Sequence, residues 1–108
     1  MIAVPSAFTS ATGRDHWEVL LRARAIEDQV FVVAPNQVGV APPHYDSFGH
    51  SSIVDPWGTV LVVAPDEECF VAADLDLDAQ DSVRASLPSL ANRRPRAYSW
   101  PQLTEARA

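Results

Sequence analysis

The sequence predicts an α/β fold in which a mixed sheet is covered on one face by one long helix. Short apolar runs rich in β-branched residues recur between turn signals, and one stretch has a strong helical period. The chain has 108 residues, of which 47% are hydrophobic and 20% charged. This size and composition are typical of a single globular domain.

The first predicted element is a strand at residues 2–5, ended by Pro5. Strand residues follow Met1 directly, although natural domains usually begin with a few loose residues. We therefore expect that an earlier part of the domain is missing from this sequence. Residues 6–13 are small and polar around a single Phe8, which predicts a loop.

The strongest helical signal runs from Asp15 to Asp28. Asp15 and Glu18 have the spacing of a capping box, in which the aspartate accepts a backbone N–H of the first turn. Opposite charges four residues apart, at Glu18 with Arg22 and at Arg24 with Asp28, support the helix further. The expected apolar stripe comprises Trp17, Leu20, Leu21 and Ala25, widened by Val19, Ala23 and Ile26.

Three further strands and a loop are predicted after this helix. Residues 30–34 form a continuous apolar run, typical of a strand buried on both faces. Residues 35–50 read as a long loop. Residues 52–55 and 59–63 read as a hairpin whose turn has Pro56 at its second position and Gly58 at its fourth.

The last part of the chain predicts one more strand at residues 69–75 and a short helix at residues 76–86, capped by Asp76 or Asp78. The chain from Leu87 onward, with three prolines, reads as irregular. The sheet face away from the long helix also reads as apolar, so we expect it to need a cover.

Charge and residue usage exclude several classes of function. The net charge of −6 argues against a nucleic-acid or anionic-membrane partner. No lysine is present, which excludes a Schiff-base enzyme and a P-loop. Cys69 is the only cysteine, which excludes a cysteine-ligated zinc site and is typical of a reducing compartment. No apolar run is long enough for a transmembrane helix and no signal peptide is visible, so a cytoplasmic location is expected.

One motif suggests a catalytic serine and one set of residues suggests a metal site, and both signals are weak. Gly49, His50 and Ser51 resemble a serine nucleophile elbow, but that elbow needs a strand before the serine and a helix after it. The simpler interpretation is a loop that enters a strand. The histidines that could bind a metal lie on different predicted elements, and none forms a pair four residues apart on a helix. They are therefore interpreted as ordinary solvated histidines. The ligands of such a site would come from His16, His44 and His50 with Asp15 and Asp46.

The remaining reactive side chains also have simpler interpretations. Cys69 follows two glutamates, whose charge opposes thiolate formation, so it reads as structural. Glu18 and Glu27 on the helix have arginines nearby and read as ion pairs. Arg93, Arg94 and Arg96 could bind an anion, but such a run is more often a solvated tail. The residues alone therefore provide no convincing nucleophile, base and orienting group together.

Six blocks in order resemble the carbon–nitrogen hydrolase (nitrilase) superfamily, and within it the Nit-like omega-amidase and aliphatic amidase group. Any single block is weak, but their order over residues 2–98 is specific. The resemblance covers only the C-terminal portion of that domain, with residues 99–108 as a tail. The blocks lie at residues 5–9, 12–18 with 21–29, 36–39, 48–51, 55–58, and 87–98.

The resemblance implies the C-terminal part of an α-β-β-α sandwich that forms homo-oligomers through helices, here the helix from Asp15 to Asp28. It implies hydrolysis of a small amide or nitrile without a cofactor or metal, through a glutamate base, a lysine and a cysteine that forms a thioester. In the family these three residues precede the matching blocks. No catalytic residue is therefore assigned here, and the isolated chain is expected to be inactive.

Two residues are carried over as substrate contacts. The loop at residues 5–9 lines the mouth of the active site in the family, so Phe8 and Thr9 are the predicted substrate-binding residues. The simpler interpretation is that Phe8 only packs under the loop. Two other functions stay open: a non-catalytic interaction module that assembles with a separate or full-length nitrilase-like partner, and a related N-acyltransferase.

Overall fold

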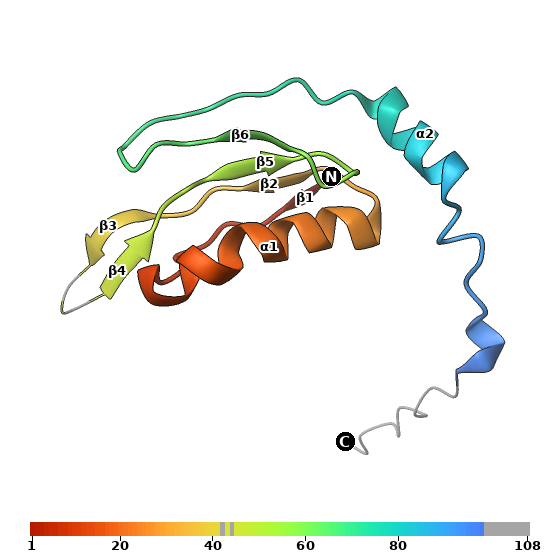
Figure 1. The fold of residues 1–108 in the computed structure, drawn as a ribbon, viewed down its shortest axis with the longest axis horizontal. Helices are drawn as coiled ribbons and strands as arrows, with labels where there is room; N and C mark the ends of the chain where they lie inside the picture. Colours follow the sequence, from red (N-terminus) through yellow and green to blue (C-terminus); the bar gives the residue numbers. More distant parts are fainter. Residues whose placement is uncertain (42, 44, 99–108) are drawn as a thin grey trace, which may run out of the picture.

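The computed structural model describes residues 1–41, 43 and 45–98 of the chain. Figure 1 shows twisted β-strands with a long helix, α1, on one side and a shorter helix, α2, beyond them. The elements in order are β1 (Ile2–Ala3), α1 (Ser10–Asp28), β2 (Val32–Ala34), β3 (Val38–Ala41), β4 (Tyr45–Phe48), β5 (Ser52–Val54), β6 (Val60–Val63), α2 (Leu77–Ser86) and the 3-10 turn η1 (Pro95–Ala97).

The main sheet is mixed, as predicted. Its strand order is β1-β2-β5-β6, with β1 parallel to β2 and the other neighbours antiparallel. α1 connects the parallel pair, since parallel strands need a crossover and cannot be joined by a tight turn. This topology places the ends of β1 and β2 side by side at one edge of the sheet.

α1 begins five residues before the predicted start at Asp15. Thr9, not Asp15, is the residue before the first turn, and its side chain accepts a hydrogen bond from the Thr12 N–H at 3.4 Å. The Gly13 N–H also donates to the Thr9 carbonyl at 2.8 Å. The prediction was wrong because a threonine cap satisfies the free N–H groups of the first turn as well as an aspartate does.

α1 packs on the sheet through part of the predicted stripe. Trp17, Leu21 and Ala25 are buried against β2 and β5, where Val32 and Val54 are fully buried. The predicted ion pairs of the exposed side are present, at 3.5 Å for Arg22 with Glu18 and 3.1 Å for Arg24 with Asp28. The rest of the predicted stripe does not pack on the sheet in this way, since Val19, Leu20 and Ile26 are exposed.

Gly13 fits α1 closely against β4, and this fit is testable. A Cβ at Gly13 would overlap the Phe48 side chain, approaching its Cβ to 2.5 Å. We expect Gly13→Ala to lower the free energy of unfolding by about 1–2 kcal/mol, because overpacking outweighs the helix propensity gained. Urea unfolding followed by circular dichroism measures this change.

The control for Gly13→Ala removes the overlapping ring. In the background of Phe48→Ala, which removes the ring together with its Cγ, the alanine substitution at Gly13 should cost clearly less. A stabilising effect of Gly13→Ala in the unmodified chain would contradict the close fit between α1 and β4.

The β5–β6 hairpin is confirmed, and its turn is fastened to α1. The Gly58 N–H donates to the Asp55 carbonyl at 3.0 Å, as a four-residue turn requires. The Asp55 carboxylate accepts the N–H groups of Trp57 and Thr59, both at 2.8 Å. Arg22 Nε donates to the Gly58 carbonyl at 2.8 Å, which ties the helix to the end of the sheet.

The prediction of a long loop at residues 35–50 is wrong for its middle part, which forms two strands. β3 and β4 form an antiparallel pair there, with Val38 opposite Phe48 and Gly39 opposite Ser47. Val40 and Tyr45 are exposed, so the ribbon has no continuous buried face. It lacks the alternation of apolar and polar residues by which strands are found in a sequence.

The strand predicted at residues 69–75 is absent. This segment is extended but belongs to no sheet, because no neighbouring strand in the described part of the chain pairs with it. α2 follows it with Asp76 as the predicted cap, accepting from the Ala79 N–H at 3.0 Å. The predicted tail at residues 99–108 lies outside the described residues.

α2 is joined to the end of α1 through a buried glutamine. Gln29 ends α1 in a left-handed conformation with φ of 51°, and its Nε2 donates to the Leu87 carbonyl at 2.7 Å. Arg84 Nε donates to the Gln29 carbonyl at 3.2 Å. Of the helices among the described residues, none combines the length and the apolar character that crossing a membrane would require.

Candidate functional site

An open surface hollow of about 510 Å³ lies at the carboxyl ends of the parallel strands β1 and β2. In open sheets with parallel strands, ligands typically bind in the crevice beyond these ends, because the loops that follow the strands lie there. The cavity is lined by Pro5, Ser6, Ala7, Pro35, Asn36 and Gln37. We call it the carboxyl-end cavity.

The two loops that form this cavity are joined by backbone hydrogen bonds. The Ser6 N–H donates to the Pro35 carbonyl at 2.9 Å, and the Gln37 N–H donates to the Ser6 carbonyl at 3.0 Å. The parallel pairing of β1 and β2 therefore continues past the strands as a bridge between Ser6 and Asn36. The two loops of the cavity wall are consequently tied to each other and to the ends of β1 and β2.

Asn36 is the central side chain of this region, and only 8% of its surface is exposed. Its Oδ1 accepts the Phe8 N–H at 2.8 Å, and its Nδ2 donates to the Gly49 carbonyl at 2.6 Å. Its backbone N–H donates to Ser51 Oγ at 2.8 Å. These contacts, which we call the Asn36 network, join the loop after β1 to the end of β2 and to the connection between β4 and β5.

Asn36 was not singled out from the sequence. An asparagine after a predicted strand is common in loops, and its hydrogen-bond partners lie 13 and 28 residues away in the chain. Such contacts produce no periodic pattern in the sequence. The run of Asn36, Gln37 and Gly39 was noted only as part of a family block.

Phe8 and Thr9, the predicted substrate-binding residues, lie directly after the cavity-lining residues of their loop. The Phe8 ring packs on Trp17, with ring centres 5.2 Å apart, and supports the core. Thr9 caps α1. Both side chains therefore have structural roles, and contact with a substrate stays a prediction.

The cap at Thr9 gives a testable effect on stability. We expect Thr9→Ala to lower the free energy of unfolding by about 1 kcal/mol, because the Thr12 N–H loses its acceptor. Thr9→Ser keeps the hydroxyl and should restore most of that loss. Equal effects of the two substitutions in urea unfolding would contradict capping by the side chain.

The structure agrees with the simpler interpretation of the serine-elbow motif, a loop that enters a strand. Ser51 Oγ accepts the Asn36 N–H and donates to the Asn36 carbonyl at 3.1 Å, and strand β5, not a helix, follows it. Ser51 thus fastens the chain to the Asn36 network. This arrangement lacks the exposed hydroxyl and the following helix of a nucleophile elbow.

His50 makes a contact that the sequence did not predict. Its φ of 55° is left-handed, which is uncommon for a residue other than glycine. Its Nδ1 lies 2.9 Å from the Phe48 carbonyl and 3.0 Å from Asp66 Oδ1, and its ring stacks on Phe48 at 4.2 Å. The carbonyl of His50 accepts from Trp17 Nε1 at 2.8 Å, so this turn is anchored to the core.

The other candidate sites do not form. Among the described residues, no group of three or more His, Cys, Asp or Glu side chains is placed to hold a metal, and His44 lies outside these residues. Cys69 is exposed. Glu18 and Glu27 are exposed partners of arginines, as the simpler interpretation predicted.

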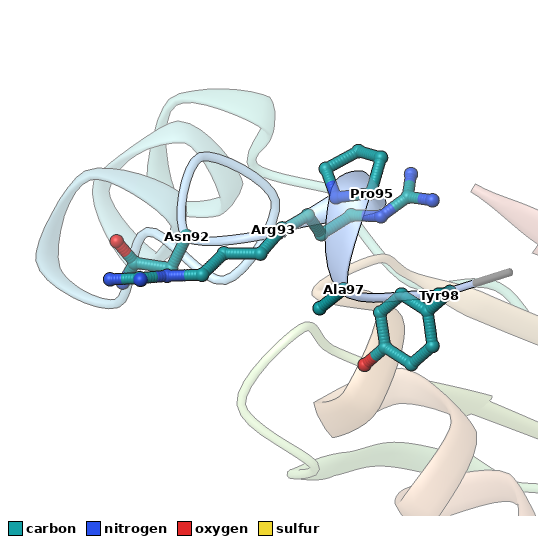
Figure 2. A pocket seen from close by; sticks show the side chains of 6 residues that line it. Asn92, Arg93, Pro95, Ala97 and Tyr98 are labelled. Carbon is teal, nitrogen blue, oxygen red and sulfur yellow. The ribbon is translucent and has the colours of Figure 1, made fainter.

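The arginine run borders a cavity but does not build an anion site. A cavity of about 490 Å³ is lined by Asn92, Arg93, Arg94, Pro95, Ala97 and Tyr98. Figure 2 shows the side chains that line this cavity, and both arginines among them are exposed. Exposed arginines on a segment of this kind are typical of a solvated stretch, as the simpler interpretation has it.

Comparison with known proteins points to one family. Residues 1–85 match the sequence profile of the family described as Carbon-nitrogen hydrolase. The chain is 50% identical over 93 residues to the probable hydrolase nit2 of Schizosaccharomyces pombe, covering 83% of this chain and 34% of that protein. It is 47% identical over 98 residues to the deaminated glutathione amidase of Bos taurus, covering 91% of this chain and 30% of that protein.

A solved structure agrees with the fold. The crystal structure of the Caenorhabditis elegans NitFhit protein superimposes with a TM-score of 0.82 at 43% identity, covering 90% of this chain and 24% of that chain. The chain spans 22% to 34% of the length of the curated relatives that it matches.

Proposed function

Because the chain belongs to the carbon–nitrogen hydrolase family, we propose that it is the C-terminal part of an amidase that cleaves small amides through a cysteine thioester. In this proposal the glutamate, lysine and cysteine of the family come from other polypeptide, since the chain has no lysine and its single cysteine, Cys69, does not line the carboxyl-end cavity. The chain supplies walls and support for the pocket.

The carboxyl-end cavity carries this proposal. It lies where the loops after two parallel strands meet, and the Asn36 network holds both loops in place. A reaction that passes through a thioester needs its substrate held in one orientation, and rigid loops on a sheet provide such positioning. Phe8 and Thr9 remain the residues proposed to contact the substrate at the mouth.

The proposed fold of the complete domain is the α-β-β-α sandwich that the resemblance implies. α1 covers one face of the main sheet, and the extended residues 69–75 run over the other face. A second sheet built on this extended segment would complete the sandwich. A cytoplasmic location goes with this proposal, because a free thiol such as Cys69 persists in reducing compartments.

The test is a chimera with a similar amidase. Residues 1–98 would replace the matching part of the deaminated glutathione amidase of Bos taurus, and the chimera would be assayed beside the 108-residue chain on deaminated glutathione, a small ω-amide and a small nitrile. We expect the chimera to hydrolyse an amide and the 108-residue chain to show no turnover. Turnover by the 108-residue chain alone, or a folded chimera without activity, would overturn the proposal.

A matched variant tests the assignment of the nucleophile. Cys69→Ser in the chimera should leave hydrolysis unchanged, because Cys69 is exposed and lies outside the carboxyl-end cavity. A loss of activity in this variant, with the fold intact, would show that the reacting cysteine is in this chain.

A second candidate function, a non-catalytic module that assembles with copies or relatives of itself, is favoured by the outer side of α1. Val19, Ala23 and Ile26 form a stripe at helical spacing, opposite the buried stripe, and 64% of Val19 is exposed. An apolar stripe of this kind is typical of a helix that packs on a second copy.

The association of α1 is tested by light scattering over a range of concentrations. We expect a dimer that Val19→Glu abolishes, whereas Ala11→Glu, an exposed position outside the stripe, leaves it unchanged. A stable monomer at all concentrations would contradict the module, and this outcome is independent of the hydrolysis assay.

A further inference from the structure

A second surface hollow, of about 420 Å³, lies between the first turns of α1 and the β3–β4 ribbon. Residues of α1, of both ribbon strands, of the connection after β4 and of the loop after β6 line it. We call it the α1–β4 hollow. It shares no lining residue with the carboxyl-end cavity, so each can hold a ligand independently of the other.

One face of the β3–β4 ribbon forms the base of this hollow. Asp46 and Phe48 lie two residues apart on β4, so their side chains share a face. Val38 is the cross-strand partner of Phe48, and the His50 ring stacks on Phe48 with centres 4.2 Å apart. The base is therefore apolar at Val38 and Phe48 and carries a carboxylate, Asp46, on the same face.

Charges of opposite sign border the hollow from different elements. Arg14 lies on α1, whereas Asp46 lies on β4 and Asp66 in the loop after β6. Ser10, the first residue of α1, also borders the hollow, so the partial positive charge of the helix N-terminus adds to that of Arg14. The hollow is consequently positive toward α1 and negative toward the ribbon.

The charges of Arg14 and Asp46 do not neutralise each other. In the part of the chain that the structure describes, neither side chain forms an ion pair. Asp66 differs, since its Oδ1 lies 3.0 Å from His50 Nδ1. One guanidinium and one carboxylate thus border the same space while both stay available to a ligand.

This separation of charge determines the chemical class of ligand that fits. A simple anion would lie near Asp46 and Asp66, and a simple cation would lie near Arg14 and the helix N-terminus, so each would meet a like charge. A molecule with one carboxylate and one ammonium group meets an opposite charge at both ends. Free amino acids and dipeptides have these two groups, and a volume of about 420 Å³ accommodates them.

We propose that the α1–β4 hollow binds a small zwitterion, a free amino acid or dipeptide, with its carboxylate toward Arg14 and its ammonium group toward Asp46. The planar fork of a guanidinium matches the two oxygens of a carboxylate. This inference goes beyond the proposed amidase role, because the hollow is separate from the carboxyl-end cavity and binding there requires no reaction.

The experiment titrates the 108-residue chain with L-alanyl-L-alanine at low salt and follows the amide signals by NMR. Two blocked forms are the matched ligands: the N-acetyl dipeptide lacks the ammonium group, and the dipeptide amide lacks the carboxylate. We expect the free dipeptide to bind with a Kd in the millimolar range and to shift the amides of Arg14 and Asp46. Each blocked form should bind about fivefold more weakly, because exposed ion pairs contribute little individually.

Variants of the chain assign each end of the ligand to its partner. Arg14→Gln should weaken binding of the free dipeptide about fivefold but leave binding of the dipeptide amide unchanged, since that form has no carboxylate. Asp46→Asn should weaken the free dipeptide equally and leave the N-acetyl form unchanged. The control is Arg24→Gln, because Arg24 lies on α1 outside the hollow and pairs with Asp28, and it should change nothing.

Equal affinity for the free and the blocked dipeptides would overturn the proposal, because the charges would then not select the ligand. Shifts confined to another part of the chain, or a loss with Arg24→Gln as large as with Arg14→Gln, would overturn it as well. The same holds for unchanged spectra at about 20 mM dipeptide. The chimera contains every residue of the hollow, so repeating the titration on it tests binding with the rest of an amidase present. Whether the chimera hydrolyses amides has no bearing on these results.

Discussion

Replacing Trp17 with alanine should lower the free energy of unfolding by about 3–5 kcal/mol. Only 2% of Trp17 is exposed, and its ring packs against Phe8 in the core between α1 and the main sheet. Its Nε1 also donates to the His50 carbonyl at 2.8 Å. The substitution removes a large apolar surface and leaves a cavity. A small domain has only about 5–15 kcal/mol in total, so much of the chain should unfold.

Two further variants divide this effect between packing and hydrogen bonding. Trp17→Phe keeps most of the apolar volume but loses the donor, and should cost about 1–2 kcal/mol. The His50 carbonyl still accepts from Ser52 Oγ at 2.7 Å, so it is not left without a partner. The matched control is Trp57→Ala, since 62% of Trp57 is exposed, and its cost should stay below about 0.5 kcal/mol.

Urea unfolding followed by circular dichroism at the helical band measures these changes without relying on tryptophan fluorescence. An equal loss of stability for Trp17→Ala and Trp57→Ala would contradict the placement of the core. A neutral Trp17→Ala would show that α1 does not pack on the sheet through this side chain.

The parts of the fold that bury a regular face were predictable from the sequence. Trp17, Leu21 and Ala25 recur at helical spacing because one side of α1 meets the sheet, and the apolar runs of β2 and β5 reflect burial on both faces. The turn after β5 was also predictable, because Gly58 adopts a φ of 87° that favours glycine.

The start of α1 and the β3–β4 ribbon were not predictable, for two different reasons. The first turn of α1 is fixed by the cap at Thr9 and by the fit of Gly13 against Phe48, a contact between residues far apart in sequence. β3 and β4 expose Val40 and Tyr45, so no buried face marks them. Residues 69–75 show the converse, since a strand-like sequence forms a ladder only where a neighbour is available.

The candidate site was only partly predictable. Residues 5–7 of the block at residues 5–9 border the carboxyl-end cavity, whereas Phe8 and Thr9 do not line it, so their contact with a substrate stays a prediction. Asn36, which holds this loop in place, joins three segments through hydrogen bonds that no local pattern reports. The substitution with the second large effect therefore lies at a position that the sequence did not mark.

Replacing Asn36 with alanine should lower the free energy of unfolding by about 2–4 kcal/mol. The Phe8 N–H and the Gly49 carbonyl would each lose a partner at 2.8 Å and 2.6 Å in a region with little access to water. An unsatisfied buried polar group costs about 1–3 kcal/mol, so two such groups outweigh the small apolar contribution of the side chain.

Asn36→Asp separates the two hydrogen bonds with almost no change in shape. The aspartate keeps an acceptor for the Phe8 N–H but places an oxygen against the Gly49 carbonyl, where the amide was a donor. Its cost should match or exceed that of alanine, since it adds repulsion and a buried charge. The exposed Asn92→Ala is the control and should change stability by less than about 0.5 kcal/mol.

Hydrogen–deuterium exchange distinguishes a local effect at the cavity from general unfolding. Relative to the unmodified chain, Asn36→Ala should raise the exchange rates of the Phe8 and Gly49 amides more than those of the α1 amides. The reason is that the Asn36 network holds the loop after β1 and the connection from β4 to β5. Uniformly faster exchange in every element would mean that Asn36 acts only on the core.

In the chimera, a loop displaced by this variant should lower the rate of hydrolysis by on the order of a hundredfold, because small misplacements of a positioned substrate are costly. Unchanged exchange at Phe8 together with unchanged hydrolysis would show that the wall of the carboxyl-end cavity stands without Asn36.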